Sequence, residues 1–330
     1  MADQDKTEKQ LFDEFADALK LDPDERRRAQ DLHNEITALL KKYGLIITAF
    51  LQGSLARKTM IAPLRDVDKI VIVAMALLGL SPDEIMDRLE AVLADAYPSA
   101  TFERTRHSLK MDFGSDSFTF DTVPARELDG DTDDVEIVNR GTGGWTRSNT
   151  RELIRVVAER NQATGGRFVE QVRMGKQAVL HALDGDLPGL HVEAIAYDAI
   201  TTMLDHGVAV CRIFERGARM LAGDYGDPTG RDVISQRLDP VVKERARQWF
   251  VEAARHAKEA RDLAARGDVS AAQDIWRNLF GDPFPKPVAQ HADDAIRNLY
   301  GGTITSTGRV SPTSVGRHPG GNSTRSWRLQ

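Results

Sequence analysis

The chain has 330 residues and a formal net charge of −6, which excludes a polycation that coats nucleic acid. Hydrophobic residues make up 41% of it and charged residues 28%, the balance of a globular protein, and the length predicts two domains. Its single cysteine, Cys211, excludes an internal disulfide framework and a thiolate zinc site. The N-terminus has no secretion-signal pattern, and the longest apolar run, residues 70–80, is too short to cross a membrane. We therefore expect a cytoplasmic protein without membrane contact.

Helices are expected over the first 43 residues. Apolar side chains recur with helical spacing over residues 11–19, and a longer helix is expected over Asp22–Tyr43, ended by Gly44. One further helix begins with a capping box at Ser81–Glu84. It interrupts a β-rich region, in which strands are expected over residues 45–51, 66–74, 108–113 and 118–123.

The rest of the chain has a different pattern. Residues 149–280 are almost wholly helical in periodicity, with breaks expected at residues 165–166, 187–189, 226–228 and 267–268. The last 30 residues hold four arginines and no acidic residue, and carry too little apolar surface to fold alone. The sequence therefore predicts an α+β protein with three parts: N-terminal helices and a β-containing core over 1–145, a helical lobe over 146–300, and a flexible basic tail over 301–330.

The dipeptide Gly53-Ser54 is the first candidate for chemistry. It follows the strand that ends in Leu51-Gln52 and is expected to open a helix over residues 55–58. Free backbone N–H groups and a hydroxyl at such a junction suit a phosphate group. A plain tight turn would have the same pattern, so this junction does not decide the function alone.

Three aspartates are the other candidates. Asp66 and Asp68 lie two residues apart at the start of a strand, so they share a face and repel each other unless a cation lies between them. Acidic pairs at exposed strand starts are also common. Asp121 stands inside an apolar strand, and such a break in the local pattern favours a functional site, although the solvent face of an edge strand would also explain it.

Together these features resemble the polymerase β-like nucleotidyltransferases. The strings 52–59 (QGSLARKT) and 61–68 (IAPLRDVD) are similar to those of the CD-NTases, bacterial relatives of cyclic GMP–AMP synthase from CBASS anti-phage systems, of the SMODS-domain type. The resemblance implies a nucleotidyltransferase lobe with a mixed β-sheet, a long spine helix over Asp22–Tyr43, and a helical lobe that closes the active-site cleft.

The same resemblance implies roles for individual residues. Asp66, Asp68 and Asp121 would bind two Mg²⁺ ions, with Mn²⁺ as an alternative, and Asp121 would help to activate the attacking hydroxyl. The donor phosphates would be bound by Gln52, Gly53 and Ser54, with Lys176 reaching them from the helical lobe. In the segment Pro188–Glu193, Gly189 replaces a serine that contacts the triphosphate in the family, which removes a hydrogen bond of about 1 kcal/mol.

The function implied is the joining of NTPs, ATP and further candidates such as GTP, into a cyclic di- or trinucleotide second messenger that activates an anti-phage effector. The tail would bind a HORMA-domain regulator, or merely solubilise the protein, and activation by nucleic acid stays open. Three alternatives also stay open: an RNA-end or small-molecule nucleotidyltransferase, a synthase that does not close a ring, and a binding module of the same fold.

Overall fold

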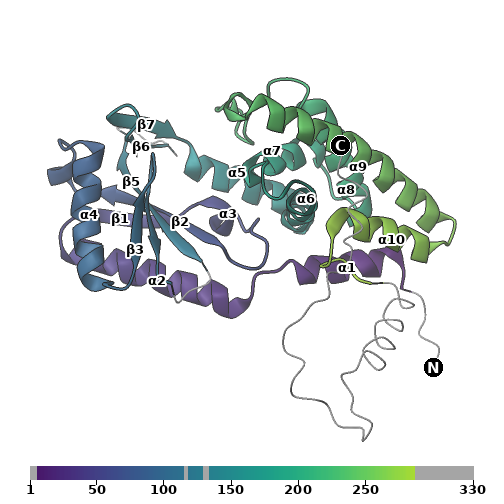
Figure 1. Ribbon diagram of the computed structural model, residues 1–330, viewed down its shortest axis with the longest axis horizontal. Helices are drawn as coiled ribbons and strands as arrows, with labels where there is room; N and C mark the ends of the chain where they lie inside the picture. The colour runs from purple at the N-terminus through teal and green to yellow at the C-terminus, as the bar shows by residue number, and fades with distance from the viewer. Residues whose placement is uncertain (1–5, 115–117, 129–133, 287–330) are drawn as a thin grey trace, which may run out of the picture. The chain divides into compact units, whose positions relative to one another are not determined.

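A computed structural model of the protein describes residues 6–114, 118–128 and 134–286 (Figure 1). The predicted tail therefore lies outside the described residues. The helices are α1 (Glu8–Ala18), α2 (Pro23–Lys42), α3 (Gly53–Ala56), α4 (Pro82–Ala96), α5 (Thr150–Ala163), α6 (Arg167–Leu183), α7 (Gly189–Ala199), α8 (His206–Met220), α9 (Pro240–Ala265) and α10 (Val269–Phe280), with short 3-10 turns at Met75–Leu77 and Ile234–Arg237. The strands are β1 (Ile46–Leu51), β2 (Asp66–Val73), β3 (Thr101–Arg104), β4 (Leu109–Asp112), β5 (Thr119–Glu127), β6 (Val135–Asn139) and β7 (Gly144–Ser148).

The strands form one mixed sheet, as expected. Its order is β1-β2-β5-β4-β3, and β6 and β7 continue from the far end of β5. Only the β2–β5 pair is parallel among the strand pairs of the described chain. The sequence did not predict β3, β6 and β7, because they are only four or five residues long, and β3 and β7 are half-exposed or exposed along their whole length, without an apolar alternation.

Helix α2 packs along one face of this sheet. It begins as expected, with Asp22 capping the backbone N–H of Asp24 and proline in the first turn, and Gly44 follows it with φ +67°. Its buried stripe, which includes Leu32 and Ile36, shares a core with α4 and with the side chains on that face of β2 and β4. The predicted capping box of α4 is present.

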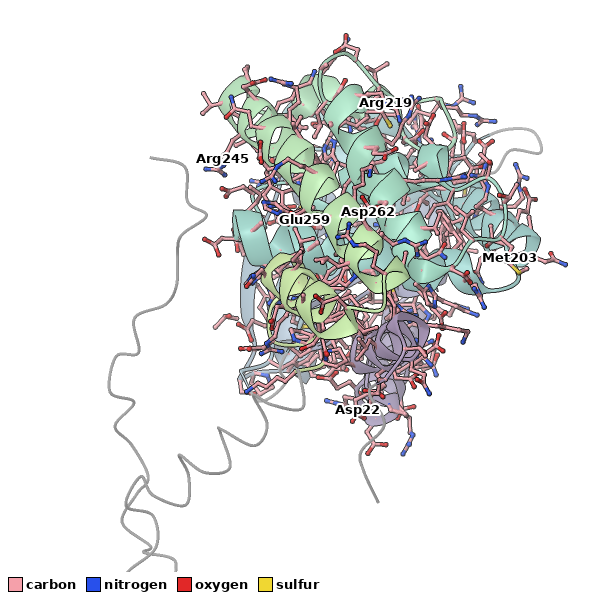
Figure 2. All side chains as sticks on the ribbon, turned by 90° about the vertical axis from the view of Figure 1, so that its right-hand side faces the viewer. Asp22, Met203, Arg219, Arg245, Glu259 and Asp262 are labelled. Carbon is pink, nitrogen blue, oxygen red and sulfur yellow. The ribbon has the colours of Figure 1, made fainter. Side chains whose placement is uncertain are left out.

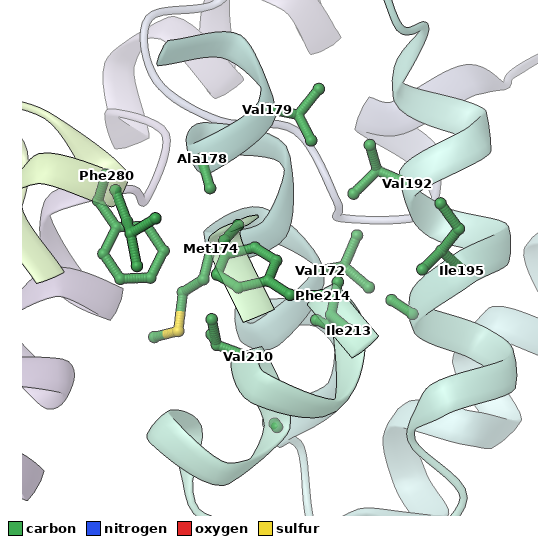
Figure 3. Packing of buried hydrophobic residues seen from close by; sticks show 14 of the residues in the cluster. Val172, Met174, Ala178, Val179, Val192, Ile195, Val210, Ile213, Phe214 and Phe280 are labelled. Carbon is green, nitrogen blue, oxygen red and sulfur yellow. The ribbon is translucent and has the colours of Figure 1, made fainter. Parts of the chain in front are cut away.

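A second core lies among the helices. Figure 3 shows Met174 and Ala178 of α6, Val192 of α7 and Phe214 of α8 among the residues of this cluster. Helix α9 contributes small residues and Phe250 to it. Its opposite face carries charged side chains that point outward, as Figure 2 shows for Arg245, Glu259 and Asp262.

Helix α1 belongs to this second core by its packing. Phe12 and Phe15 contact Trp276, Phe280 and Phe284 near the end of the helical region. The predicted first part of the chain, residues 1–145, grouped α1 with the sheet, whereas these contacts place α1 with the helices. The boundary at residue 145 itself stays a prediction. All four breaks expected in the helical region are present, and the structure adds one between α7 and α8.

No helix in the described parts of the chain has the length and apolar character needed to span a membrane.

Candidate active site

The parallel β2–β5 pair brings the three predicted aspartates together. Asp66 and Asp68 lie on one face of β2, and the register places Asp121 of β5 directly beside Asp68. Because β5 lies between β2 and β4, Asp121 is on a central strand, and the alternative of an edge strand is wrong.

The electrostatics of this face favour a cation. Burial raises the pKa of Asp68 to about 6, helped by the negative charges of Asp66 and Asp121 and opposed by Arg57. Burial also raises the pKa of Asp121, although a hydrogen bond from the Ser108 hydroxyl (3.2 Å) opposes this. A bound cation would stabilise the ionised form of carboxylates whose pKa is raised in this way.

Among the described residues, no three acidic, histidine or cysteine side chains already converge as a set of metal ligands. The fold provides neighbouring backbone positions for Asp66, Asp68 and Asp121, whose carboxylate oxygens are the ligands that Mg²⁺ prefers. Asp66, Asp68 and Asp121 are therefore the residues that would hold a magnesium ion on this face.

The Gly-Ser turn packs directly against Asp68. The backbone N–H of Gln52 donates to the carbonyl of Asp68 (2.9 Å), and the Gln52 side-chain oxygen accepts from the Thr150 hydroxyl (3.0 Å). Gly53 has φ +67°, and a Cβ atom there would lie 1.9 Å from Asp68 Oδ2. Only glycine permits this conformation and this close approach at once.

The helix at this turn, α3, begins two residues earlier than predicted, at Gly53, and also ends earlier. We expected it to continue through residue 58, but α3 ends at Ala56, and Lys58 has φ +61° in the left-handed region. A helix of four residues has a small dipole, so any phosphate affinity of this turn comes from its N–H groups and the Ser54 hydroxyl rather than from a long helix.

Lys176 lies on α6 and is largely buried. Its ammonium donates to Glu193 Oε1 (2.6 Å) and to the Thr59 hydroxyl (3.2 Å). Burial alone would raise the pKa of Glu193, but Lys176 and Arg57 outweigh this effect and hold that pKa well below its usual range. A Cβ atom at Gly189 would lie 3.1 Å from Lys176 Cε, so the glycine that departs from the family pattern makes room for this lysine.

The sequence reasoning assigned no role to Arg57, Thr59 and Glu193. The structure joins them in one buried network beside the turn. One signal was available for Glu193. It stands in the apolar run Val192–Ala196, and this is the kind of break in pattern that singled out Asp121.

A cavity of about 560 Å³ lies in the helical region between the end of α7 and the loop over residues 223–230. Asp227 in its lining accepts a hydrogen bond from the Asn149 side chain (2.7 Å). Asn149 precedes Thr150, whose hydroxyl binds Gln52, so a short chain of contacts connects the cavity lining with the Gly-Ser turn.

Comparison with known families decides what this site belongs to. Residues 6–161 match the Second Messenger Oligonucleotide or Dinucleotide Synthetase (SMODS) domain. This part of the chain is a SMODS domain. The chain is also 23% identical over 348 residues to the cyclic AMP-AMP-GMP synthase of Enterobacter hormaechei, covering 83% of this chain and 88% of the relative.

Solved structures agree with the SMODS assignment at the level of the fold. The CD-NTase CdnG of Bradyrhizobium diazoefficiens, in complex with GTP, is similar with a TM-score of 0.69 and 15% identity, over 82% of this chain and 95% of CdnG. The CdnC protein of Escherichia coli in its complex with a HORMA protein is similar with a TM-score of 0.65 and 15% identity, over 84% and 98%. The chain is a nucleotidyltransferase related to the CD-NTases, and the family and fold class expected from its motifs are confirmed.

Proposed function

We propose that this chain joins NTPs, ATP among them, into a cyclic di- or trinucleotide and releases pyrophosphate. The observation that carries the proposal is the parallel register of Asp68 with Asp121 beside the Gly53-Ser54 turn. A row of carboxylates next to a phosphate-binding turn suits in-line attack on a nucleoside triphosphate. The similarity to a cyclic AMP-AMP-GMP synthase supports a ring as the product.

Each predicted site residue has a role in this proposal. Asp66, Asp68 and Asp121 would hold two Mg²⁺ ions, or Mn²⁺ in their place, which when bound lower the pKa of the attacking hydroxyl and neutralise the triphosphate. Ser54 and the N–H groups of the turn bind the donor phosphates. Lys176 adds positive charge beside them, and Gln52 fixes the turn to β2 through its backbone. The cavity beside Asp227 is our candidate for a nucleobase site.

The test begins with the purified chain, all four radiolabelled NTPs and Mg²⁺ or Mn²⁺, followed by phosphatase treatment and mass spectrometry. We expect a phosphatase-resistant product of two or three nucleotides, whose mass identifies the bases and the ring closure. The double variant Asp66→Ala/Asp68→Ala should make none. Asp262→Ala, an exposed aspartate on α9, is the control and should remain active. ATP consumption with Mg²⁺ by the double variant would contradict the proposal.

The alternatives give different products in the same assay. A linear oligonucleotide loses its terminal phosphates to the phosphatase, keeps its internal linkages and is distinguished from a ring by the mass of a dephosphorylated open chain. An enzyme that modifies RNA ends adds label to tRNA when tRNA and labelled NTPs are incubated together. An enzyme that modifies a small molecule consumes NTPs only after its small-molecule acceptor is added. A chain that only binds nucleotides releases no pyrophosphate with any of these acceptors.

The predicted regulation is a separate proposal. Similarity to a CdnC protein solved with a HORMA protein supports a HORMA-domain partner in an anti-phage system, and the basic segment 303–330 is our candidate for its binding peptide. A HORMA protein encoded beside this chain should be captured by the full chain but not by one truncated at residue 302. Equal capture by both would remove the tail from this role. Adding DNA or RNA to the synthesis assay tests activation by nucleic acid.

A further inference from the structure

Three residues of the helical lobe hold three consecutive residues that follow the Gly-Ser turn. We call this set of contacts the clamp; it consists of Arg57, Lys58 and Thr59 on one side and Arg173, Lys176 and Glu193 on the other. The contacts join positions more than one hundred residues apart in the sequence. None of these contacts uses the aspartates.

Glu193 is the centre of the clamp. Its side chain is 1% exposed, and its carboxylate accepts from Arg57 Nε (2.6 Å) and Nη2 (3.1 Å) and from the Thr59 hydroxyl (2.8 Å). The Lys176 ammonium donates to the same Glu193 oxygen and to Thr59. A buried carboxylate with several charge-assisted partners fixes all of them in one geometry.

Arg173 provides the second contact. Its guanidinium donates two hydrogen bonds, of 3.1 and 2.8 Å, to the carbonyl oxygen of Lys58. Lys58 is the residue with left-handed φ, a conformation that costs energy for any side chain with a Cβ atom. The two bonds therefore hold the chain reversal at the end of α3 in a conformation that it would not keep by itself.

Backbone hydrogen bonds connect the clamp to the turn. The N–H of Arg57 donates to the Gly53 carbonyl (3.2 Å), and the N–H of Thr59 donates to the Ser54 carbonyl (2.9 Å). Fixing residues 57–59 therefore fixes Gly53, which packs against Asp68, and Ser54 next to it.

We propose that the clamp positions the Gly53-Ser54 turn against Asp68, so that the helical lobe sets the geometry of a site whose carboxylates lie on the sheet. Glu193, Arg173 and Thr59 are then positioning residues for the transfer reaction. This inference rests on the proposed function, because it takes the turn to hold the donor phosphates. The inference predicts that loosening the clamp lowers the rate of nucleotide transfer more than it weakens nucleotide binding.

Thr59 offers the sharpest test. Replacing Glu193 leaves two buried cations without their carboxylate and risks unfolding the lobe. Thr59→Val removes one hydroxyl from a fully buried position and keeps the shape of the side chain, and Thr59→Ser restores the hydroxyl. Thr164→Val is the matched control, because Thr164 is equally buried and its hydroxyl donates to the Arg160 carbonyl, far along the chain from the turn.

The first measurement is hydrogen exchange at the amides of residues 57–59. Thr59→Val should lose protection there by about tenfold, while Thr59→Ser and Thr164→Val should not. The second is a comparison of kcat with the dissociation constant of a non-hydrolysable ATP analogue. We expect Thr59→Val to lower kcat by about tenfold or more, with less than about threefold change in binding, since small misplacements act on the transition state.

The outcomes separate the two proposals. Unchanged protection in Thr59→Val, or equal loss in Thr164→Val, would overturn the clamp whatever the activity. Lost protection with unchanged kcat, or with weakened binding alone, would overturn its positioning role. Lost protection in a chain whose wild type transfers no nucleotide would support the clamp as a structural device and refute the proposed function.

Discussion

Replacing Gly53 by alanine should separate the geometry of the site from the stability of the fold. Two effects act at this position. Alanine in the left-handed region costs about 1–2 kcal/mol. Its Cβ would also lie 1.9 Å from Asp68 Oδ2, whereas contacts to real Cβ atoms are essentially never under 3.0 Å, so the carboxylate must move by about 1 Å. A displacement of this size at a reacting centre can lower the rate about one hundredfold.

Gly44 provides a matched control. It has the same φ of +67°, but a Cβ atom there would meet nothing within 4 Å. We therefore expect Gly44→Ala and Gly53→Ala to lose similar stability, about 1–2 kcal/mol each. Asp68 Oδ2 and Cγ, which would lie 1.9 and 2.8 Å from the new Cβ, both move when the side chain rotates about its Cα–Cβ bond, and Asp68 Cβ at 3.1 Å needs only a small shift. Only Gly53→Ala should lose about one hundredfold in activity.

Urea unfolding followed by circular dichroism measures the first quantity, and pyrophosphate release from ATP with Mg²⁺ measures the second. The reasoning would be refuted if Gly53→Ala kept activity within threefold of Gly44→Ala. The position of Asp68 would then not limit the reaction. A much larger loss of stability in Gly53→Ala alone would show that the carboxylate cannot rotate away, and that the two effects are not separable.

Three further predictions concern stability. Asp68 holds its proton up to about pH 6 in the folded state but only to about pH 3.9 when unfolded, so folding stability falls as the pH rises between these values. In metal-free urea titrations, Asp68→Asn should be up to about 3 kcal/mol more stable than the wild type at pH 7. This advantage should vanish below about pH 4 and shrink when Mg²⁺ is added. Lys69 is fully buried, donates to the His33 carbonyl (3.0 Å) and has its pKa lowered by burial to about 7. Lys69→Met should raise the free energy of unfolding by about 2–4 kcal/mol at pH 7, and the gap should shrink as the pH rises toward the unfolded-state pKa of about 10.4 and close above it, where lysine is neutral in both states. Phe15→Ala should lower the free energy of unfolding by about 3–5 kcal/mol, because the Phe15 ring is fully buried in the second core with its centroid 4.5 Å from that of Phe280. A loss below about 1 kcal/mol would mean that α1 is not part of that core.

The elements that the sequence predicts well carry local signals. Helix α2 has a proline in its first turn, an apolar stripe and a terminal glycine, and α4 has a complete capping box, so both begin within a residue of the predicted positions. Strand β2 is an apolar run between clear boundaries. Asp66, Asp68 and Gly53 could be singled out because spacing within a few residues already implies a shared face or a tight turn.

Other features depend on contacts that no local pattern encodes. The apolar stripe of α1 shows that this helix is buried, but not that it packs against residues near 280. The hairpin of β6 and β7 exists because β5 extends beyond β4 and offers an open edge for pairing. The clamp joins Thr59 to Glu193 across 134 positions, so only the folded chain reveals it.

The site gathers several locally unfavourable features around a single strand. Asp68 lies beside two like charges, Lys69 next to it is a buried cation, and Gly53 packs against Asp68 with left-handed φ. Residues 70–73 of the same strand are at most 2% exposed and pack into apolar cores on both faces of the sheet. This packing offsets the strain, because burial of those side chains stabilises the fold only when β2 keeps its register. The register that buries them is also the one that aligns Asp68 with Asp121, so a slip that relieved the repulsion would expose the core.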